Sequence, residues 1–295
     1  MGSYSIKDLE RLSGIKAHTI RIWEKRYGLI EPTRTPTNIR AYSDDELKKI
    51  LNISILNRNG LKISKIAELN SQEISSLVAK LTEDKADPEN QLESLYISMI
   101  DMDETLFEKL LSRAIIQLGF EEMVIDVLYP FFKRIGIMWQ TGTITPAQEH
   151  FISNLVRQKF IVAIDSIVLN ESADSKTFVL YLPENELHEL GLLFMNYILK
   201  KRGHKVIYLG AIVPLSSLIS MIKLRPADYI VTSVVGSMEE EDLEAYIHEV
   251  SEEFPDLTIF LTGNQAQSLK KTPKNVKLVP SIKDFIKIAD SISPH

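Results

Sequence analysis

The stretch Leu182–Gly191, with the sequence LPENELHELG, decides how the second half of the chain is predicted to fold. It begins where an apolar run, Thr177–Leu182, ends. The Val, Leu, Tyr and Phe residues of that run are typical of a buried parallel strand. A helical pattern, Leu187–Lys201, follows. Because ligands of open α/β sheets bind beyond the carboxyl ends of the strands, we expect His188 to lie in a ligand crevice.

Three residues of this stretch suit a metal or cofactor site. Glu186 stands two residues before His188 and can accept a hydrogen bond from one ring nitrogen, which leaves the other nitrogen for a metal. Gly191 lets a bulky ligand approach the backbone. A single His after a strand is more often simply solvated, so the interpretation depends on its neighbours.

Two further strand ends supply such neighbours. Ser233 and Val235 end the strand that begins at Tyr229, and Gly263 and Asn264 follow the next strand along the chain. Parallel strands open on the same edge of a sheet, so these residues should meet His188 there. Strands are predicted to begin at Thr177, Lys205, Tyr229, Leu257 and Asn275, and helices at Leu187, Pro214, Glu240 and Ser281. This alternation predicts a doubly wound parallel sheet, Rossmann- or flavodoxin-like, over residues 172–295.

The set of strand-end residues resembles the cobalamin-binding domain of methionine synthases, mutases and cobalamin-dependent regulators, whose pattern is D-x-H-x-x-G, then S-x-L, then G-G. The resemblance implies that His188 is the lower axial ligand of cobalt. It also implies that Ser233 and Gly263 line the slot for the nucleotide tail. The sequence departs from the pattern in three places, with Glu186 for Asp, Val235 for Leu and Asn264 for the second Gly.

Composition limits the class of protein. The chain has 295 residues, 44% of them hydrophobic and 25% charged, which is ordinary for a globular protein of two or three domains. No apolar run approaches the roughly 20 residues of a membrane span, and the N-terminus has no signal core, so a cytoplasmic location is expected. Cysteine is absent, which excludes disulfides, zinc fingers and thiolate metal sensing.

Charge is distributed unevenly along the chain. Residues 1–81 carry fourteen Lys and Arg against nine Asp and Glu, whereas the remainder carries twenty against thirty-one. This distribution indicates that only the basic N-terminal part, residues 1–81, binds a polyanion.

Residues 1–80 have the pattern of a DNA-binding domain. Two short helical patterns joined at Ser13-Gly14 predict a helix-turn-helix, with the second helix in the major groove. A Pro- and Asn-rich stretch up to Tyr42 predicts a hairpin wing, and Ser43 with Glu46 forms a capping box that opens a third helix. The candidate DNA contacts are His18, Thr19, Arg21 and Lys25 on the second helix and Arg34, Arg40 and Tyr42 on the wing.

This stretch resembles the winged domain of MerR-type regulators. Their pattern is present as Thr19-Ile20-Arg21, Trp23-Glu24, Gly28-Leu29, Pro32-Thr33-Arg34 and Arg40-Ala41-Tyr42. The resemblance implies a double-stranded DNA operator as partner. The long dimerisation helix of ordinary members is missing, because residues 82–90 have the polar, Pro-containing composition of a linker. We therefore expect homo-oligomerisation, as a dimer or tetramer, through a later part of the chain.

Residues 91–170 predict four helices with short joints, over 92–100, 104–118, 120–138 and 147–169. Trp139 ends the third helix, and a capping box of Thr145 and Gln148 opens the fourth, which places Glu149 and His150 in its first turn. From periodicity alone, Trp139 could equally be an aromatic residue of the core, and Glu149 and His150 could equally be an ordinary surface pair.

The Trp-nine-Glu-His spacing resembles the helical cap of light-responsive cobalamin regulators of the CarH and LitR type. The resemblance implies that Trp139, Glu149 and His150 cover the upper face of the cofactor, where the adenosyl group sits. Gln140 occupies a place where a His follows the Trp in the photoreceptor members.

Together these patterns predict a non-enzymatic repressor that senses cobalamin, as adenosylcobalamin, with light as a second input. In the alternative interpretation, residues 1–80 still bind DNA, and the two domains over residues 91–170 and 172–295 form a cofactor-free protein-interaction module. A cobalamin enzyme would need a substrate domain of about 250 residues, for which no room remains.

Overall fold

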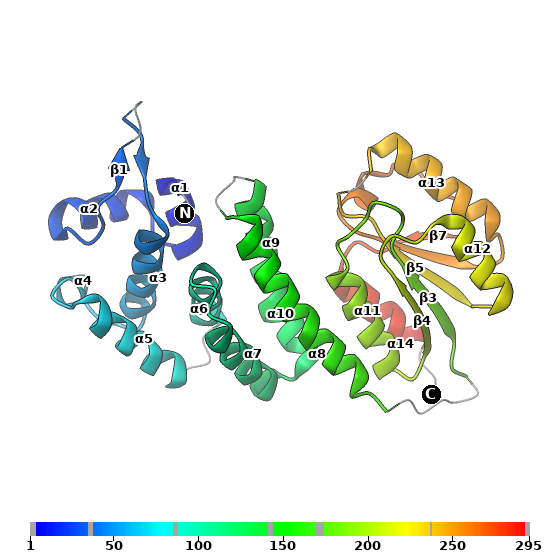
Figure 1. Cartoon of the computed structure of the whole chain (residues 1–295), viewed down its shortest axis with the longest axis horizontal. Coiled ribbons are helices and arrows are strands. Elements are labelled where there is room, and N and C mark those ends of the chain that lie inside the picture. The colour runs from blue at the N-terminus through cyan, green and yellow to red at the C-terminus, as the bar shows by residue number, and fades with distance from the viewer. Residues whose placement is uncertain are drawn as a thin grey trace. The chain divides into compact units, whose positions relative to one another are not determined.

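The computed structural model describes residues 4–34, 38–84, 88–140, 144–168, 174–236 and 238–292 (Figure 1). The chain divides into two compact units, residues 1–155 and 156–295, and each is described by itself. The first unit holds both the predicted DNA reader and most of the predicted helical segment. The second unit holds the predicted sheet.

The first part of the first unit is a winged helical domain, called here the winged head. Its elements are α1 (Ile6–Ser13), α2 (Ala17–Tyr27), β1 (Thr33–Arg34), β2 (Arg40–Ala41), α3 (Asp44–Arg58), α4 (Ile63–Ile66) and α5 (Ser71–Asp84). Ser5 opens α1 with a capping box to Asp8, and Gly14, at φ +70°, ends it. α2 follows and buries Ile20 and Trp23. The predicted helix-turn-helix is therefore confirmed.

The wing and α3 complete the winged head. β1 and β2 pair antiparallel with Thr33 opposite Ala41, and the tip of the hairpin, residues 35–37, lies outside the described residues. The predicted capping box of Ser43 and Glu46 opens α3. Neighbours surround α3 on several sides, and its buried residues are Leu47, Ile50, Leu51, Asn52, Ile53, Ser54, Ile55 and Leu56.

The predicted linker at residues 82–90 is wrong for most of its length. α5 continues to Asp84, and α6 (Pro88–Ile100) begins at Pro88, while residues 85–87 lie outside the described part. Proline fits the first position of a helix, where an N–H group has no intrahelical partner. α6 is the predicted helix 92–100 with an earlier start, and its packing against α3 stabilises the first turn that the polar composition did not indicate.

Four helical stretches, residues 88–165, form the helical segment. After α6 come α7 (Glu104–Leu118), α8 (Phe120–Met123), the π-helical turn η1 (Val124–Leu128), α9 (Tyr129–Gln140) and α10 (Pro146–Asp165). The predicted third helix is thus one run with a π turn inside it. Phe131 of α9 contacts Tyr96 of α6 and Phe107 of α7, with ring centroids 5.0 and 6.3 Å apart. α10 ends before the predicted Leu169 and continues from the first unit into the second.

The second unit contains the predicted parallel sheet. Its elements after α10 are β3 (Thr177–Tyr181), α11 (Leu190–Lys201), β4 (Lys205–Gly210), α12 (Leu215–Leu224), β5 (Tyr229–Ser233), α13 (Glu240–Glu253), β6 (Thr258–Thr262), η2 (Gln265–Ser268), β7 (Val276–Leu278) and α14 (Ile282–Ile292). The strand order is β4-β3-β5-β6-β7 and every pair is parallel. This is the flavodoxin-like order, so the predicted fold is confirmed.

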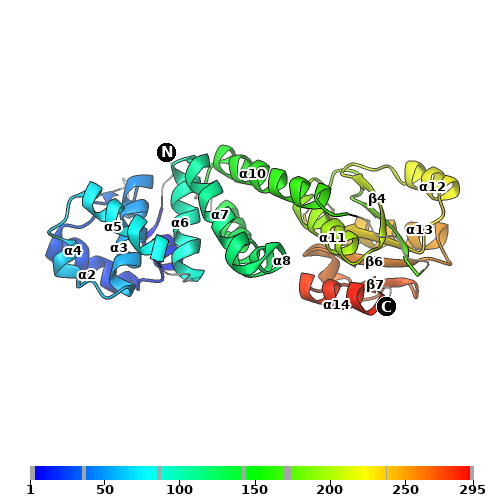
Figure 2. The same ribbon diagram turned by 90° about the horizontal axis from the view of Figure 1, so that it is seen from below.

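Helices cover both faces of the sheet. α12 and α13 lie on one face, over a core that includes Val179, Tyr181, Ile230 and Leu261, and α11 and α14 lie on the other (Figures 1 and 2). The reversal of strand order at β3 and β5 creates a crevice at their carboxyl ends, which is where the sequence placed its ligand residues. No helix in the described ranges is both long and apolar enough for a membrane crossing.

Candidate functional site

The loop from β3 to α11 holds Glu186 and His188 in a fixed arrangement. Glu186 is fully buried, whereas the His188 side chain is 65% exposed. The Nδ1 atom of His188 lies 2.5 Å from Oε1 of Glu186. The same oxygen accepts hydrogen bonds from the backbone N–H groups of Leu187 and His188, at 2.9 and 3.0 Å. The predicted carboxylate–imidazole pair is therefore formed, and it makes Nε2 the ring nitrogen that would coordinate a metal.

The second oxygen of Glu186 joins this loop to the end of β5. Oε2 accepts hydrogen bonds from the backbone N–H groups of Val235, at 2.7 Å, and Gly236, at 3.3 Å. Sequence reasoning placed Val235 at this edge of the sheet, and the structure shows that its backbone amide helps to hold Glu186. Such a contact between residues 49 positions apart leaves no local signal in the sequence.

These contacts keep Glu186 ionised. Burial alone would raise the pKa of this carboxyl, but hydrogen bonds from the His188 ring and from the amides of His188 and Val235 lower it to about 2. An ionised carboxylate that accepts from Nδ1 fixes the tautomer of His188 and increases the basicity of Nε2.

The turn after β6 depends on Gly263. Its φ is +103°, and a Cβ atom there would lie 2.1 Å from the carbonyl oxygen of Val234. Only glycine therefore allows β6 to pass this close to the end of β5. Asn264, predicted to replace the second Gly of the pattern, is exposed and has helical backbone angles at the start of η2. Ser233 is buried at the end of β5.

Gly191 has a different environment. A Cβ atom built on Gly191 would meet no heavy atom within 4 Å. Packing within the described chain therefore does not require glycine at this position. The close approach of a ligand to Gly191 stays a prediction.

A second polar cluster, missed by sequence reasoning, anchors the residue after His188. Glu189 accepts a hydrogen bond from the Tyr208 hydroxyl at 2.8 Å and forms an ion pair with Arg157. Burial raises the pKa of Tyr208, and the nearby Arg157 acts in the opposite direction. The cluster ties the loop to β4 and to the middle of α10. Arg157 and Tyr208 lie in stretches that the sequence marked only as helix and strand.

A cavity of about 400 Å³ opens beside the same edge of the sheet. It is lined by Asn185, Gly236, Met238, Glu239, Asp242, Tyr246 and Gln265. Gly236 and Met238 follow β5, while Gln265 follows β6 and accepts a hydrogen bond from the Met238 amide at 3.2 Å. The loops after two predicted site strands thus surround one hollow.

The helical segment presents its three candidate residues at or near the surface. Trp139 is 49% exposed, which removes the alternative of a core aromatic. Glu149 contacts His150 Nδ1 at 2.7 Å and accepts a hydrogen bond from Ser153 at 2.5 Å. The capping box of Thr145 and Gln148 that places this pair is formed, as predicted. The side chain of Gln140 and residues 141–143 lie outside the described part.

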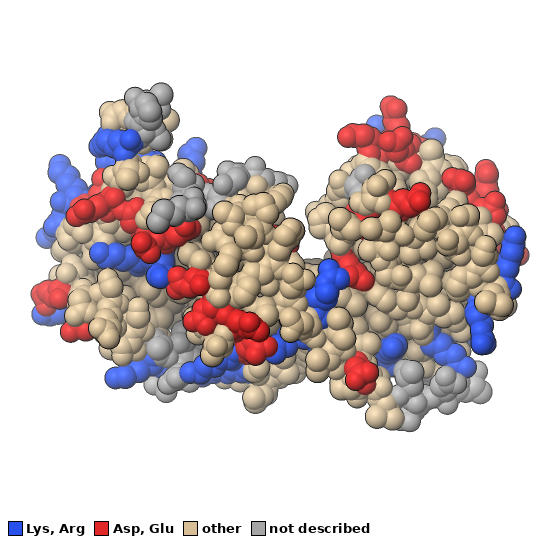
Figure 3. Space-filling view, in the orientation of Figure 1, with Lys and Arg blue, Asp and Glu red and all other residues tan. Residues whose placement is uncertain are grey.

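The recognition helix α2 exposes most of its predicted DNA contacts. His18, Arg21 and Lys25 are exposed at a spacing that puts them on one face, and Thr19 is half-buried. Lys and Arg side chains gather over this part of the molecule and on the wing (Figure 3). Ile22 is also exposed, by 51%, and was not predicted. An exposed apolar side chain on a recognition helix suits contact with a thymine methyl group.

One wing residue, Tyr42, differs from the prediction, while the DNA contacts of Arg34 and Arg40 stay predictions. Tyr42 is only 1% exposed and its backbone pairs with Tyr4, so its ring supports the wing from inside and is not placed to contact DNA. Arg40 donates from Nε to both carboxylate oxygens of Glu24, at 3.1 and 3.2 Å, and so joins the wing to α2. Arg34 is exposed and donates to Asn38 at 2.6 Å.

The fold and these sites define a class of protein: a DNA-binding regulator with a winged helix-turn-helix and a separate parallel-sheet ligand domain. Comparison with known families agrees. Residues 4–73 match the MerR HTH family of regulatory proteins, and residues 91–163 match the B12 binding domain family.

Two relatives extend the match over most of the chain. The chain is 30% identical over 274 residues to the HTH-type transcriptional repressor CarH of Myxococcus xanthus, with 90% of each chain covered. It is 25% identical over 247 residues to the repressor CarA of the same organism, covering 83% of this chain and 81% of that one. The chain therefore belongs to the family of MerR-type transcription regulators with a B12-binding domain, to which CarH belongs. The predicted family is confirmed.

A solved structure supports the fold. The monomethylamine corrinoid protein of Methanosarcina barkeri superimposes with a TM-score of 0.58 at 12% identity, covering 70% of this chain and all of that one. At this identity the match shows a shared fold alone.

Proposed function

We propose that this regulator binds adenosylcobalamin and, according to its occupancy, represses transcription from a DNA operator. The observation that carries the proposal is the Glu186–His188 pair. A buried, ionised carboxylate holds Nδ1, while the imidazole remains exposed at the carboxyl edge of the sheet. His188 would hold the cobalt ion of the cofactor through Nε2, and the Glu186 carboxylate would orient the imidazole for that contact.

The residues around this pair fit the rest of the cofactor. Gly263 and Ser233 would line the slot for the nucleotide tail, next to the hollow between the loops after β5 and β6. The open space over Gly191 would accept the corrin ring. Bound adenosylcobalamin supplies a cobalt–carbon bond that light cleaves, and this chemistry belongs to the cofactor. We include light as a second input on that ground.

The helical segment would supply the upper side of the site. Trp139 offers a half-exposed indole, an apolar surface suited to adenine or to the corrin ring. Glu149 and His150 supply polar groups in the first turn of α10. Their proposed role is to contact the adenosyl group.

The winged head would bind operator DNA through α2 and the wing. Arg21, with His18, Lys25 and Ile22 on the same helix, would enter the major groove. Two or more heads on spaced half-sites require a homo-oligomer, which we propose forms through the rear of the chain. We propose a cytoplasmic location, where a regulator of this class would reach its operator.

The test is a dark titration of the full chain with adenosylcobalamin, followed by visible absorption and gel filtration. The expected result is a spectrum altered by imidazole coordination, together with cofactor that co-elutes with the protein. His188→Ala should abolish the spectral change. The control is His248→Ala, which removes an exposed His from α13.

A spectrum identical to that of free cofactor for the unsubstituted protein would contradict cobalamin binding. It would favour the cofactor-free interaction module instead. DNA binding is tested separately, by measuring operator affinity at several salt concentrations. The affinity should fall steeply as the salt concentration rises, because the protein contacts DNA phosphates.

A further inference from the structure

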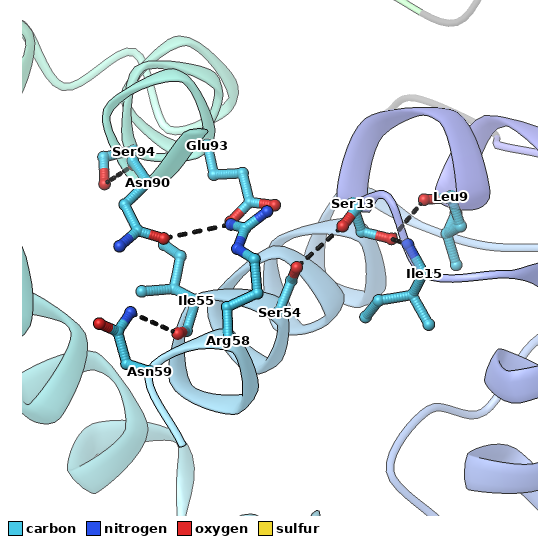
Figure 4. Close-up of polar contacts among 10 residues, drawn as sticks. All are labelled: Leu9, Ser13, Ile15, Ser54, Ile55, Arg58, Asn59, Asn90, Glu93 and Ser94. Carbon is cyan, nitrogen blue, oxygen red and sulfur yellow. Dashed lines mark hydrogen bonds and ion pairs between the residues drawn. The ribbon is translucent and has the colours of Figure 1, made fainter. Parts of the chain in front are cut away.

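α3 lies between the turn of the helix-turn-helix and the first helix of the helical segment. It contacts α1 on one side and α6 on another. Polar side chains near its C-terminal end connect with both neighbours (Figure 4). This position gives α3 a physical link to each of the two parts of the first unit.

The contact with α6 is an ion pair that is mostly buried. The Arg58 guanidinium binds the Glu93 carboxylate and donates to Asn90 Oδ1 at 3.2 Å. The Glu93 side chain is 2% exposed and Asn90 is 1% exposed, whereas the Arg58 side chain is 30% exposed. A buried carboxylate with a bound guanidinium tolerates little displacement, because separation would leave a charge in a low-dielectric site.

The contact with the helix-turn-helix begins one turn earlier on α3. Ser54 and Arg58 are four residues apart and therefore lie on the same face of the helix. Ser54 Oγ donates to the backbone oxygen of Ser13 at 2.8 Å. Ser13 Oγ in turn donates to Leu9 O at 2.6 Å and accepts from the Ile15 amide at 3.2 Å. Ser13 and Ile15 form the turn from which α2 begins.

The other side of α6 faces the helix that carries Trp139. Tyr96 of α6 packs its ring on Phe131 of α9, with centroids 5.0 Å apart. Burial raises the pKa of the Tyr96 hydroxyl, Arg134 of α9 lowers it, and Glu93 raises it. Charged residues of α6 and α9 thus act on one buried hydroxyl. Trp139 lies in the last turn of α9, little more than one turn after Arg134.

We propose that α3 couples the helical segment to the recognition helix, through Glu93–Arg58 on one side and Ser54–Ser13 on the other. The inference rests on the proposed function, because cobalamin against Trp139 would be the change that α9 and α6 pass on. α3 responds as a rigid element, so a displacement of α6 moves the turn before α2.

The coupling does not operate by covering the DNA-reading surface. His18, Arg21 and Lys25 remain exposed while Arg58 and Glu93 are in contact. The contact therefore holds the winged head in a conformation whose reading surface is open. Its effect falls on the orientation of α2, and through it on affinity for an operator.

The experiment uses the full chain and two substitutions. Glu93→Gln removes the charge of the α6 contact and keeps the side-chain shape, and Ser54→Ala removes the link to Ser13. The control is Lys65→Gln, which removes an exposed ion pair on α4. Hydrogen exchange of the Ile15 amide is measured without cofactor. We expect both substitutions, but not the control, to accelerate this exchange by about fivefold or more, because they loosen the turn.

The second readout is the ratio of operator affinities with and without adenosylcobalamin. Both variants should keep the cofactor spectrum of the unsubstituted protein and bring this ratio at least about fivefold closer to one. An unchanged Ile15 exchange rate in both variants would overturn the coupling, and so would an unchanged ratio. Failure of the unsubstituted protein to bind cobalamin would refute the proposed function, and Ile15 exchange would then decide the coupling alone.

Discussion

Replacing Glu186 with Gln tests how the proposed cobalt ligand is held. The substitution keeps the shape of the side chain but removes its charge. It also turns one oxygen into an NH₂ group that faces backbone N–H donors, from Leu187 and His188 on one side or Val235 and Gly236 on the other. At least one set of donors loses its acceptor.

The magnitude follows from the pKa of Glu186. The pKa falls from 4.5, its ordinary value, to about 2 in the folded protein. This difference corresponds to about 3 kcal/mol of folding free energy, as an upper bound. A depressed pKa means that the unfolded chain binds the proton more tightly. The stabilisation is therefore fully present above about pH 4.5 and is lost as the pH falls towards about 2.

The assay is urea unfolding of the second unit, followed by circular dichroism and by hydrogen exchange at Val235. Glu186→Gln should lower the free energy of unfolding by about 2–3 kcal/mol at pH 7, and this difference from the unsubstituted protein should shrink at pH 3. It should also weaken cobalamin binding by about 10- to 100-fold, because the imidazole loses its partner. The matched control is Glu184→Gln, an exposed residue of the same loop. Equal stability and equal cofactor affinity of the two variants at pH 7 would refute the reasoning.

Four further substitutions test other parts of the molecule. Gly263→Ala should destabilise the second unit by about 2 kcal/mol or more in thermal unfolding, because its Cβ atom would meet Val234 at a positive φ. Gly191→Ala should leave stability unchanged and weaken cobalamin binding. Equal stability of the two variants would contradict the close approach of β6 to β5. Arg21→Ala should weaken operator binding and lower the salt slope by about 1 in a filter or fluorescence titration, and an unchanged slope would place the recognition surface elsewhere. Tyr42→Phe should leave operator affinity unchanged, because the ring is buried, so a marked loss would restore the predicted DNA contact.

The features predicted well from sequence are those set by local chemistry. Ser43 accepts a hydrogen bond from the amide three residues ahead, so the start of α3 could be predicted from the local sequence alone. The five strands followed from apolar runs separated by helical patterns. The position of His188 followed from the general rule for open parallel sheets.

The features that were missed depend on contacts between distant residues. The linker prediction failed because α3 stabilises the start of α6 by packing, and the composition of a segment does not show which distant residues contact it. The burial of Tyr42 comes from its pairing with Tyr4. The partners of Glu186 beyond His188 are backbone amides, whose positions no side-chain pattern records.

The bond between Glu186 and the Val235 amide also sets an order of events during synthesis. Glu186 and His188 leave the ribosome well before Val235 and Gly236, and until β5 pairs with β3 the Glu186 carboxylate has only local partners. A nascent chain that ends before Val235 would contain both members of the pair without the amides of the β5 end that hold Glu186. We therefore expect the proposed cofactor site to form only after β5, the third strand of the sheet along the chain, has left the exit tunnel and paired with β3.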